Sequence, residues 1–451
     1  MMTRRQAVTT SMLGGAMLAG GPASAERASA PAPAIRQKTP LANFGRARQL
    51  MAQHGLDALV VRQSVNVRYF AGYEPFLTRL GFETPGLVVV PADPLRPATL
   101  IASSVDVWRL SQQDEWHPEN IIPFTGTADL EALKQASMPQ AYSADMGWPI
   151  QEQGLTQIDK DMIAYVDRFS ADAAPSPQWG LVKALRDLGL EKSVIGYDDA
   201  AIAQMIAGHG LDDVTCRDGI NLIRRIRMVK TAGEVGLMRT VGERNAAAAN
   251  AAMAAIQPGM TLSDIQRLFA IETAKRDLAA VFIVAGSLHE LPHGEVVEGE
   301  PILVDAVSSY QGYHGDYGRT FLLGEAPRAF KPKTQKLQIA WQAAFDMIRP
   351  GVRYSEIRAA AIEAVRKAAI GEQLSVVNPH SVGLQHTDEP GIEDMPSFVK
   401  DDIVLEAGMT MTVDLPHLEP GWGACHLEDL IVVTENGAEP LHDMSRPVVE
   451  L

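Results

Sequence analysis

Two aspartates occupy the two arms of one predicted β-hairpin. Asp305 follows the apolar run at 302–304, which is typical of a buried strand, and Asp316 precedes a second strand-like run at 317–323. Turn-forming residues at 308–312 separate the two arms. A carboxylate buried without a partner costs several kcal/mol, and a divalent cation between two of them removes that cost. The hairpin therefore suggests half of a metal site, although in isolation one acid could be a turn residue and the other a surface acid.

Three more ligand-type side chains stand at the edges of later strand-like segments. His380 lies in NPHSVGLQH, Asp414 ends the alternating run MTMTVD, and Glu428 enters the apolar run of HLEDLIVVT. With the hairpin aspartates they make four carboxylates and one imidazole. Such an oxygen-rich set suits two divalent ions such as Mn²⁺, Co²⁺ or Zn²⁺. We therefore expect the five side chains to converge on one pocket.

The hairpin also carries a longer pattern. Residues 305–320 read D-x4-Y-x-G-Y-x2-D-x2-R-T, and the chain from about 55 to 441 resembles the pita-bread metallopeptidases, which include methionine aminopeptidase, aminopeptidase P, prolidase and creatinase. The resemblance implies metal ligands at Asp305, Asp316, His380, Asp414 and Glu428. It also implies that a water or hydroxide bridging two cations is the nucleophile, and that Asp414 doubles as general acid/base.

Two histidines outside the ligand set take catalytic positions by the same resemblance. His293 lies in LPHGE before the hairpin, and His386 lies in GLQHTDEP after the ligand His380. In relatives these imidazoles approach the scissile carbonyl and stabilise the tetrahedral intermediate. A donor near developing oxyanion charge contributes a few kcal/mol, so we expect both in the active site. For His293 the alternative is a solvent-exposed loop residue.

Two positions depart from the pattern of the resembling family. Asp414 stands where the family usually has Glu, and the missing methylene shortens the reach by roughly 1.3 Å. Asp414 is therefore either a ligand on a strand that lies closer, or an acid behind a site with one tight and one weak metal. His426 stands where the xaa-proline members usually carry Arg, and it cannot grip a carboxylate as a guanidinium fork does. Arg319 is predicted to pair with a ligand carboxylate.

The elements that must position these residues fall into two groups, of which the first lies before residue 226. Strand candidates at 56–61, 86–93, 99–103 and 193–199 alternate with helical stretches, which indicates an α/β layer. The block GLDALVVRQSVNVRYFAGY resembles the start of a creatinase-like N-terminal domain, which we place at 41–225.

The second group, at 226–451, repeats one motif. Two helical patterns separated by Pro258-Gly259 lead to a short strand, and two more separated by Pro350-Gly351 follow the hairpin. The four patterns run over 234–256, 262–276, 333–348 and 354–370. The repeat indicates an α+β pita-bread catalytic domain with a pseudo-twofold duplication.

The first 40 residues are predicted to be an export signal followed by a linker. Arg4-Arg5 precedes a modestly apolar stretch and a small-residue cleavage site at 23–25, which predicts a twin-arginine signal peptide over 1–25 and a periplasmic protein. The Ala/Pro-rich stretch 26–40 is predicted to be a linker. A net charge of −15 disfavours nucleic acid and anionic membranes as partners, and no apolar run approaches the ~20 residues of a membrane span.

These observations favour an exported dinuclear metallohydrolase of the xaa-proline aminopeptidase or dipeptidase type, acting on a small peptide or amide. We expect two divalent cations, Mn²⁺ first with Co²⁺ or Zn²⁺ as alternatives, and a homodimer as in relatives. Two other hypotheses stay open. One is a pita-bread enzyme with diverged chemistry, such as small-amide hydrolysis or dimethylsulfoniopropionate lysis. The other is a non-catalytic binding relative, against which the retained ligand set argues.

Overall fold

The computed structural model describes residues 39–451 except 83–85, 114–115, 126–147, 287–289, 370–373, 375 and 393–399. The predicted signal peptide 1–25 and nearly all of the predicted linker 26–40 lie outside the described residues. Among the described helices, none combines the length and the apolar character that a membrane crossing requires.

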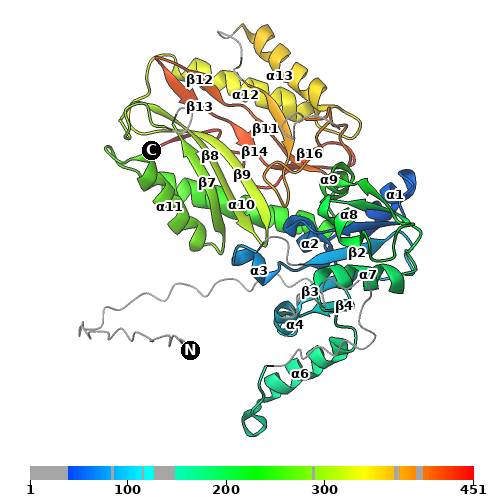
Figure 1. Cartoon of the computed structure of the whole chain (residues 1–451). Helices are drawn as coiled ribbons and strands as arrows, with labels where there is room; N and C mark the ends of the chain where they lie inside the picture. The colour runs from blue at the N-terminus through cyan, green and yellow to red at the C-terminus, as the bar shows by residue number, and fades with distance from the viewer. Residues whose placement is uncertain are drawn as a thin grey trace, which may run out of the picture. The chain divides into compact units, whose positions relative to one another are not determined.

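The N-terminal part is built on a six-stranded mixed sheet with the order β4-β3-β2-β1-β5-β6 (Figure 1). The central strand β1 pairs antiparallel with β2 and parallel with β5. Its alternate residues fill two different cores, Leu59 and Val61 in one and Ala58 and Val60 in the other, because successive side chains of a strand point to opposite faces. The strands are β1 (Ala58–Val61), β2 (Leu87–Pro91), β3 (Thr99–Ser103), β4 (Asn120–Phe124), β5 (Val194–Tyr197) and β6 (Thr215–Asp218).

Helices accompany this sheet, as the predicted α/β layer requires. They are α1 (Phe44–Gln53), α2 (Ser64–Ala71), α3 (Phe76–Arg79), α4 (Ser104–Leu110), the 3-10 turn η1 (Glu152–Gly154), α6 (Gln157–Ser170), α7 (Pro177–Asp187), α8 (Ala201–Ile206) and α9 (Ile220–Met228). The predicted boundary between residues 225 and 226 falls inside α9, so the chain enters its second part as a helix; the extents of the two domains stay predictions.

The second part contains the predicted hairpin as β8 (Pro301–Tyr310) and β9 (Tyr313–Leu322). The turn is shorter than the sequence suggests, because residues 308–310 still pair in the strand and only Gln311 and Gly312 turn, both with positive φ. β7 (Ala279–Ala285) borders β8, while β14 (Glu428–Asp429) and β17 (Val448–Glu450) border β9.

A second sheet has the order β10-β11-β15-β16. Its strands are β10 (Asn378–Ser381), β11 (Thr410–Asp414), β15 (Ile431–Val433) and β16 (Ala438–Pro440), and β12 (His417–Glu419) with β13 (Gly423–Cys425) forms a separate hairpin. Two helix pairs accompany the sheets: α10 (Ala232–Met253) with α11 (Leu262–Ala274), and α12 (Phe330–Met347) with α13 (Tyr354–Ala368) (Figure 1). Each pair precedes strands of one sheet, which confirms the predicted repeat of helices and strands.

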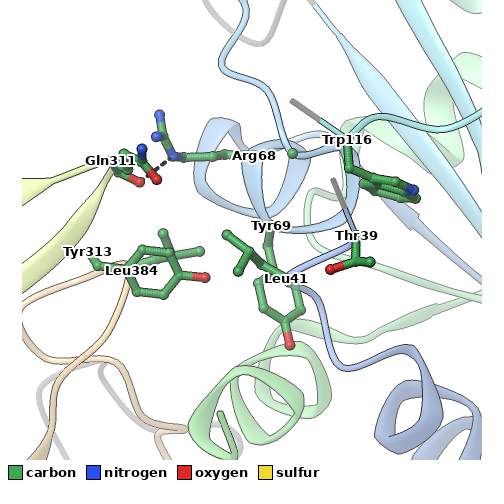
Figure 2. Close-up of a pocket in the computed structure, with 9 residues that line it drawn as sticks. Thr39, Leu41, Arg68, Tyr69, Trp116, Gln311, Tyr313 and Leu384 are labelled. Atoms are coloured by element: carbon green, nitrogen blue, oxygen red, sulfur yellow. Dashed lines mark hydrogen bonds between the residues drawn. The ribbon is translucent and has the colours of Figure 1, made fainter. Parts of the chain in front are cut away.

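The two parts touch through a small pocket beside the β8–β9 turn. Figure 2 shows Arg68 of α2 donating from Nε to the Gln311 carbonyl at 3.0 Å, with Tyr313 and Leu384 lining the same pocket. Its volume of about 40 Å³ suits a few water molecules rather than a substrate. The pocket is therefore a contact between the two parts and not a candidate active site.

Candidate metal centre

The register of the first sheet brings three predicted ligands to one face. Asp305 pairs with Gly318 and Val307 with Asp316, so the two aspartates lie diagonally across the hairpin. Glu428 of β14 pairs with Gly318 from the other side. Because residues opposite each other on neighbouring strands share a face, all three acids project from the same face of the sheet.

The second sheet supplies His380 and Asp414. His380 on β10 lies opposite Thr412, two residues before Asp414 on β11, so these side chains also share a face. His380 Nε2 lies 3.3 Å from Asp414 Oδ2, and it reaches the first sheet at 3.6 Å from Glu428 Oε1 and 3.7 Å from Asp316 Oδ2. The structure therefore brings the predicted ligands of both sheets together.

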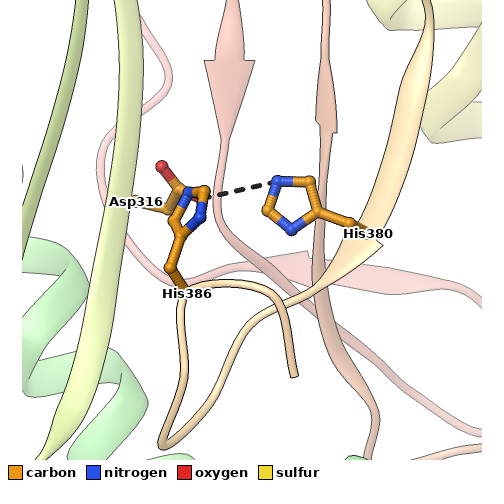
Figure 3. Close-up of side chains that lie close together, drawn as sticks. All are labelled: Asp316, His380 and His386. Atoms are coloured by element: carbon orange, nitrogen blue, oxygen red, sulfur yellow. Dashed lines mark ion pairs between the residues drawn. The ribbon is translucent and has the colours of Figure 1, made fainter. Parts of the chain in front are cut away.

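Three overlapping sets of these residues could hold a metal ion, since one ligand atom of each member lies within 4.8 Å of the others. The sets are Asp305, Asp316 and Glu428; His380, Asp414 and Glu428; and Asp316, His380 and His386. Figure 3 shows the third set, with the side chains of Asp316, His380 and His386 pointing toward one another. Because the sets share members, the cluster could hold two ions through common carboxylates.

The buried polar atoms of the cluster fit a cation better than they fit one another. Both carboxylate oxygens of Asp316 and of Glu428, Oδ1 of Asp305, and Nε2 of His380 and His426 are buried without a hydrogen-bond partner. Each such atom costs about 1–3 kcal/mol, and more when it is charged. A divalent cation satisfies carboxylates and neutral imidazoles together, so this donor set fits the metal that the sequence predicts.

Burial and neighbouring charges shift the pKa values of the side chains in the cluster. Burial, with Asp316 beside it, raises the pKa of Asp305 to about 7. Burial and the neighbouring carboxylates raise the pKa of Glu428 well above its ordinary value. Burial disfavours the charged form of His380, but Asp414 and Asp316 outweigh it and raise the pKa of this imidazole to about 9. Without a cation the cluster therefore keeps protons that a cation would displace.

Asp414 behaves differently from the other carboxylates. Burial works against its charge, but the imidazoles of His380 and His426 hold the pKa of Asp414 well below its usual range. Its Oδ2 also accepts a hydrogen bond from Asn378 Nδ2 at 3.1 Å, and a fifth of its side chain, 20%, is exposed. Asp414 thus lies within the cluster despite its short side chain, and its role as ligand stays a prediction.

The two predicted catalytic histidines lie in different places. His386 Nε2 is 3.2 Å from Asp316 Oδ2 and its side chain is 31% exposed, so it borders the cluster from the solvent side. Its ring packs edge-on against Phe282 with centroids 5.4 Å apart. His293 instead pairs with Glu300 at 2.7 Å on an exposed segment, and among the described residues it has no contact with the cluster. The structure brings only His386 to the site, and the catalytic role of His293 stays a prediction.

Arg319 does not pair with a ligand carboxylate, so that prediction is wrong. Its buried guanidinium pairs with Asp429 and donates to the Glu428 carbonyl at 2.7 Å. Adjacent residues of a strand point to opposite faces, so Arg319 and Asp429 meet behind the sheet while Gly318 and Glu428 face the cluster. The arginine therefore fixes β14 against β9 from the far side.

A buried ion pair that sequence reasoning missed holds the segment carrying His386. Arg227 Nε donates to Asp388 Oδ1 at 3.1 Å, and Arg227 Nη2 donates to Gln385 Oε1 at 2.7 Å. Both members of the ion pair are buried, with side chains 2% and 1% exposed. The partners stand 161 residues apart in the sequence, so no local pattern marks them.

Comparisons with known proteins fit this geometry. Residues 44–229 match the creatinase/prolidase N-terminal domain, and residues 236–435 match metallopeptidase family M24. The chain carries an M24 metallopeptidase domain. The predicted combination of a creatinase-like N-terminal domain with a pita-bread catalytic domain is thereby confirmed, and so is the resemblance to the creatinase and prolidase group.

Named relatives of this M24 protein include dipeptidases. The probable dipeptidase PepE of Mycobacterium tuberculosis is 30% identical over 239 residues, which are 51% of this chain and 62% of that protein. The match therefore spans less than two thirds of that relative. The Xaa-Pro dipeptidase of Pyrococcus horikoshii is 24% identical over 73% of this chain and 98% of its own length.

Solved structures share the fold. A dipeptidase from Pyrococcus horikoshii superposes with a TM-score of 0.65 at 20% identity, over 90% of this chain and 99% of the other. An Xaa-Pro dipeptidase from Bacillus anthracis superposes with a TM-score of 0.63 at 20% identity, again over 90% and 99% of the two chains. At this identity the similarity establishes the architecture, and the chemistry has to be argued from the site.

Proposed function

We propose that this M24 protein is a metal-dependent peptidase of the Xaa-Pro dipeptidase or aminopeptidase type, which acts on small peptides. The observation that carries the proposal is the cluster of unpartnered buried carboxylates and imidazoles at the meeting of the two sheets. Relatives named as dipeptidases support the choice of substrate class.

The residues that would hold the metal follow from the two sheets. Asp305, Asp316, His380, Asp414 and Glu428 would bind two divalent ions, with Mn²⁺ as the first candidate. Bound there, such ions would polarise a peptide carbonyl and lower the pKa of water to near neutrality. The carboxylates of Asp316 and Glu428 have both oxygens without a hydrogen-bond partner, which would leave them able to serve two ions.

The solvent exposure of His386 and Asp414 suggests a role for each side chain. His386 is 31% exposed whereas His380 is 1% exposed, so His386 is the imidazole that a substrate can reach and the donor that can stabilise an oxyanion. Asp414, at 20%, is more exposed than Glu428 at 1%, and can pass a proton between attacking water and leaving amine. Both roles are part of the proposal.

A substrate panel tests the proposal. Purified protein is loaded with Mn²⁺, Co²⁺ or Zn²⁺ and assayed with Xaa-Pro dipeptides, longer peptides with proline second, matched dipeptides without proline, a small amide and a sulfonium substrate. We expect metal-dependent cleavage of the short peptides. Turnover confined to the small amide or sulfonium compound would instead support diverged chemistry, for which the departures at Asp414 and His426 are the motivating observations. No turnover and no metal uptake would favour a binding protein.

We further propose that the protein is exported by the twin-arginine route and acts in the periplasm as a homodimer. The leader at Arg4-Arg5 supports export. Replacing both arginines by lysine should abolish periplasmic accumulation, and unchanged periplasmic levels would refute the export proposal. Sedimentation of the mature protein tests the dimer, which a monomer at micromolar concentration would exclude.

A further inference from the structure

We propose that His426 is an additional metal ligand. Its imidazole would bind one of two cations that share the carboxylates of Asp414 and Glu428, while His380 would bind the other. The inference rests on the proposed function, because it requires that the cluster binds divalent cations. It goes beyond that function because His426 occupies a position where the xaa-proline members of the resembling family usually have arginine. A guanidinium has no lone pair to offer a metal, whereas a neutral imidazole has one.

The two imidazoles stand on opposite sides of the same two carboxylates. His380 Nε2 faces Asp414 Oδ2 at 3.3 Å and Glu428 Oε1 at 3.6 Å. His426 Nε2 faces the other oxygens, Asp414 Oδ1 at 3.5 Å and Glu428 Oε2 at 3.6 Å. Each carboxylate therefore presents one oxygen to each imidazole, which is the arrangement that two ions sharing bridging carboxylates require.

These separations suit donor atoms around one ion rather than direct hydrogen bonds. Neighbouring ligands at about 2.1 Å from a cation stand about 3.0 Å apart in an octahedral site and about 3.4 Å apart in a tetrahedral one. The distances of His426 Nε2 to Asp414 and Glu428, 3.5 and 3.6 Å, lie close to that spacing. They are too long for normal hydrogen bonds, and Nε2 has no hydrogen-bond partner although the residue is only 2% exposed.

The second ring nitrogen fixes the tautomer that a ligand needs. His426 Nδ1 lies 3.2 Å from the Val304 carbonyl, which can only accept, so Nδ1 carries the hydrogen of the neutral ring. The Nε2 lone pair then points into the cluster. His380 has the same arrangement, with Nδ1 3.3 Å from the Ser381 carbonyl. Metal-binding histidines are commonly oriented by such a carbonyl acceptor.

The sheet is shaped to accommodate this ring. A Cβ added at Gly318 would stand 2.5 Å from His426 Cε1 and 2.6 Å from both His426 Nδ1 and Glu428 Cβ. Any side chain there would displace the imidazole or the neighbouring carboxylate. Gly318 lies between Asp305 and Glu428 in the register of the first sheet, so the glycine leaves room for the ring directly beside the predicted ligands.

An imidazole here also explains how a short acid can serve the site. Asp414 reaches less far than the glutamate that usually occupies this position, by roughly 1.3 Å. A nitrogen from His426 adds a donor to the cation position that Asp414 would serve poorly alone. Loss of His426 should therefore weaken one of the two metal equivalents selectively.

The test compares His426→Leu with wild type and with His442→Leu. His442 is a matched control, because it is a buried histidine whose Nε2 is already occupied as acceptor of the Leu430 N–H at 3.1 Å. Calorimetric titration with Mn²⁺ and Co²⁺ measures both equivalents, and the visible spectrum of the Co²⁺ protein reports the donor set. We expect wild type and His442→Leu to bind two equivalents. We expect His426→Leu to retain one equivalent and to bind the second at least 100-fold more weakly, with an altered Co²⁺ spectrum.

Gly318→Ala provides an independent variant that leaves the imidazole in the chain. It should weaken metal binding, because the added methyl group meets both the His426 ring and the Glu428 side chain. If His426→Leu binds both equivalents as wild type does, with an unchanged Co²⁺ spectrum, His426 is not a ligand. If wild type itself binds no metal, the proposed function fails instead.

X-ray absorption of the Zn²⁺-loaded protein leaves His426 in place and covers the case in which His426→Leu does not fold. Histidine ligation gives a recognisable imidazole scattering pattern. Because His386 also lies within reach of the cluster, the spectrum is measured for wild type and for His386→Gln. We expect an average of at least one imidazole per ion in both proteins, from His380 on one side and His426 on the other. An average of half an imidazole per ion in His386→Gln would overturn the proposal.

Discussion

Arg227 links the N-terminal part to the segment that presents His386, and its replacement should lower both the stability of the protein and its turnover. The guanidinium bonds Asp388 and Gln385 of that segment and donates through Nη1 to Asn66 of α2. Asn66 in turn donates from Nδ2 to Asp198 Oδ2 at 2.8 Å, at the end of β5. One buried side chain thus ties the N-terminal sheet to the loop beside the metal cluster.

The expected magnitude follows from burial. Removing one member of a buried ion pair leaves an uncompensated charge and costs about 3–5 kcal/mol. The pair of Arg227 and Asp388 is 2% and 1% exposed, and the charge of Lys230 still acts on Asp388, so Arg227→Met should lose about 3 kcal/mol of unfolding free energy, the lower end of that range. Arg225, two residues earlier on α9, pairs with Asp401 at 2.6 Å with both side chains about two-fifths exposed, 43% and 39%. Arg225→Met is therefore the matched control and should lose less than about 1 kcal/mol.

Activity should follow the position of His386. A displacement of about 1 Å at a catalytic group can lower turnover by about 100-fold, so Arg227→Met should lower kcat far more than it raises KM, with metal content retained. Arg227→Lys keeps the positive charge but loses the forked guanidinium, so its stability and its kcat should lie between those of wild type and Arg227→Met. Urea unfolding and peptide hydrolysis of the three variants measure both effects. Equal losses in Arg227→Met and Arg225→Met, or full turnover in Arg227→Met, would refute the reasoning.

Three further outcomes follow from the structure. Because His380 and Asp305 take up protons with pKa values of about 9 and about 7, cation affinity should fall at least tenfold for each pH unit below 7, which calorimetry at pH 5.5, 6.5 and 7.5 measures. Burial raises the pKa of Glu234 from 4.5 to about 7, so the stability that its protonated form contributes is complete below pH 4.5 and lost by pH 8. Relative to Glu234→Gln, wild type should therefore lose roughly 3 kcal/mol of unfolding free energy over that pH window, measured by urea titration. Parallel pH profiles of the two proteins would contradict this. Asp316→Ala should lose both metal and activity, and retained turnover would contradict its assignment as a ligand.

The hairpin and the ligand set could be predicted because both are marked locally. Asp305 and Asp316 stand on apolar strands at a fixed spacing, and strand register alone then places them on one face. The helix pairs are marked by the breaks at Pro258-Gly259 and Pro350-Gly351. In the structure, Thr231 and Thr261 cap the first pair, because their side chains accept from the backbone of the first helical turn. Sequence reasoning is strongest where such short-range rules act.

The parts that sequence could not give depend on contacts between distant segments. The short distance in sequence between Arg319 and Asp316 suggests that this arginine pairs with a ligand carboxylate. Strand alternation instead turns Arg319 to the far face of the sheet, where Asp429 is its partner. The free Nε2 of His426 could be recognised only once Asp414 and Glu428 were placed around it.

Anomalous diffraction from crystals of the wild-type protein soaked in Mn²⁺ tests the central claim most directly. The account predicts two peaks between the two sheets, bounded by Asp305, Asp316, His380, Asp414 and Glu428. Peaks elsewhere on the protein, or an empty cluster at millimolar Mn²⁺ and neutral pH, would contradict it.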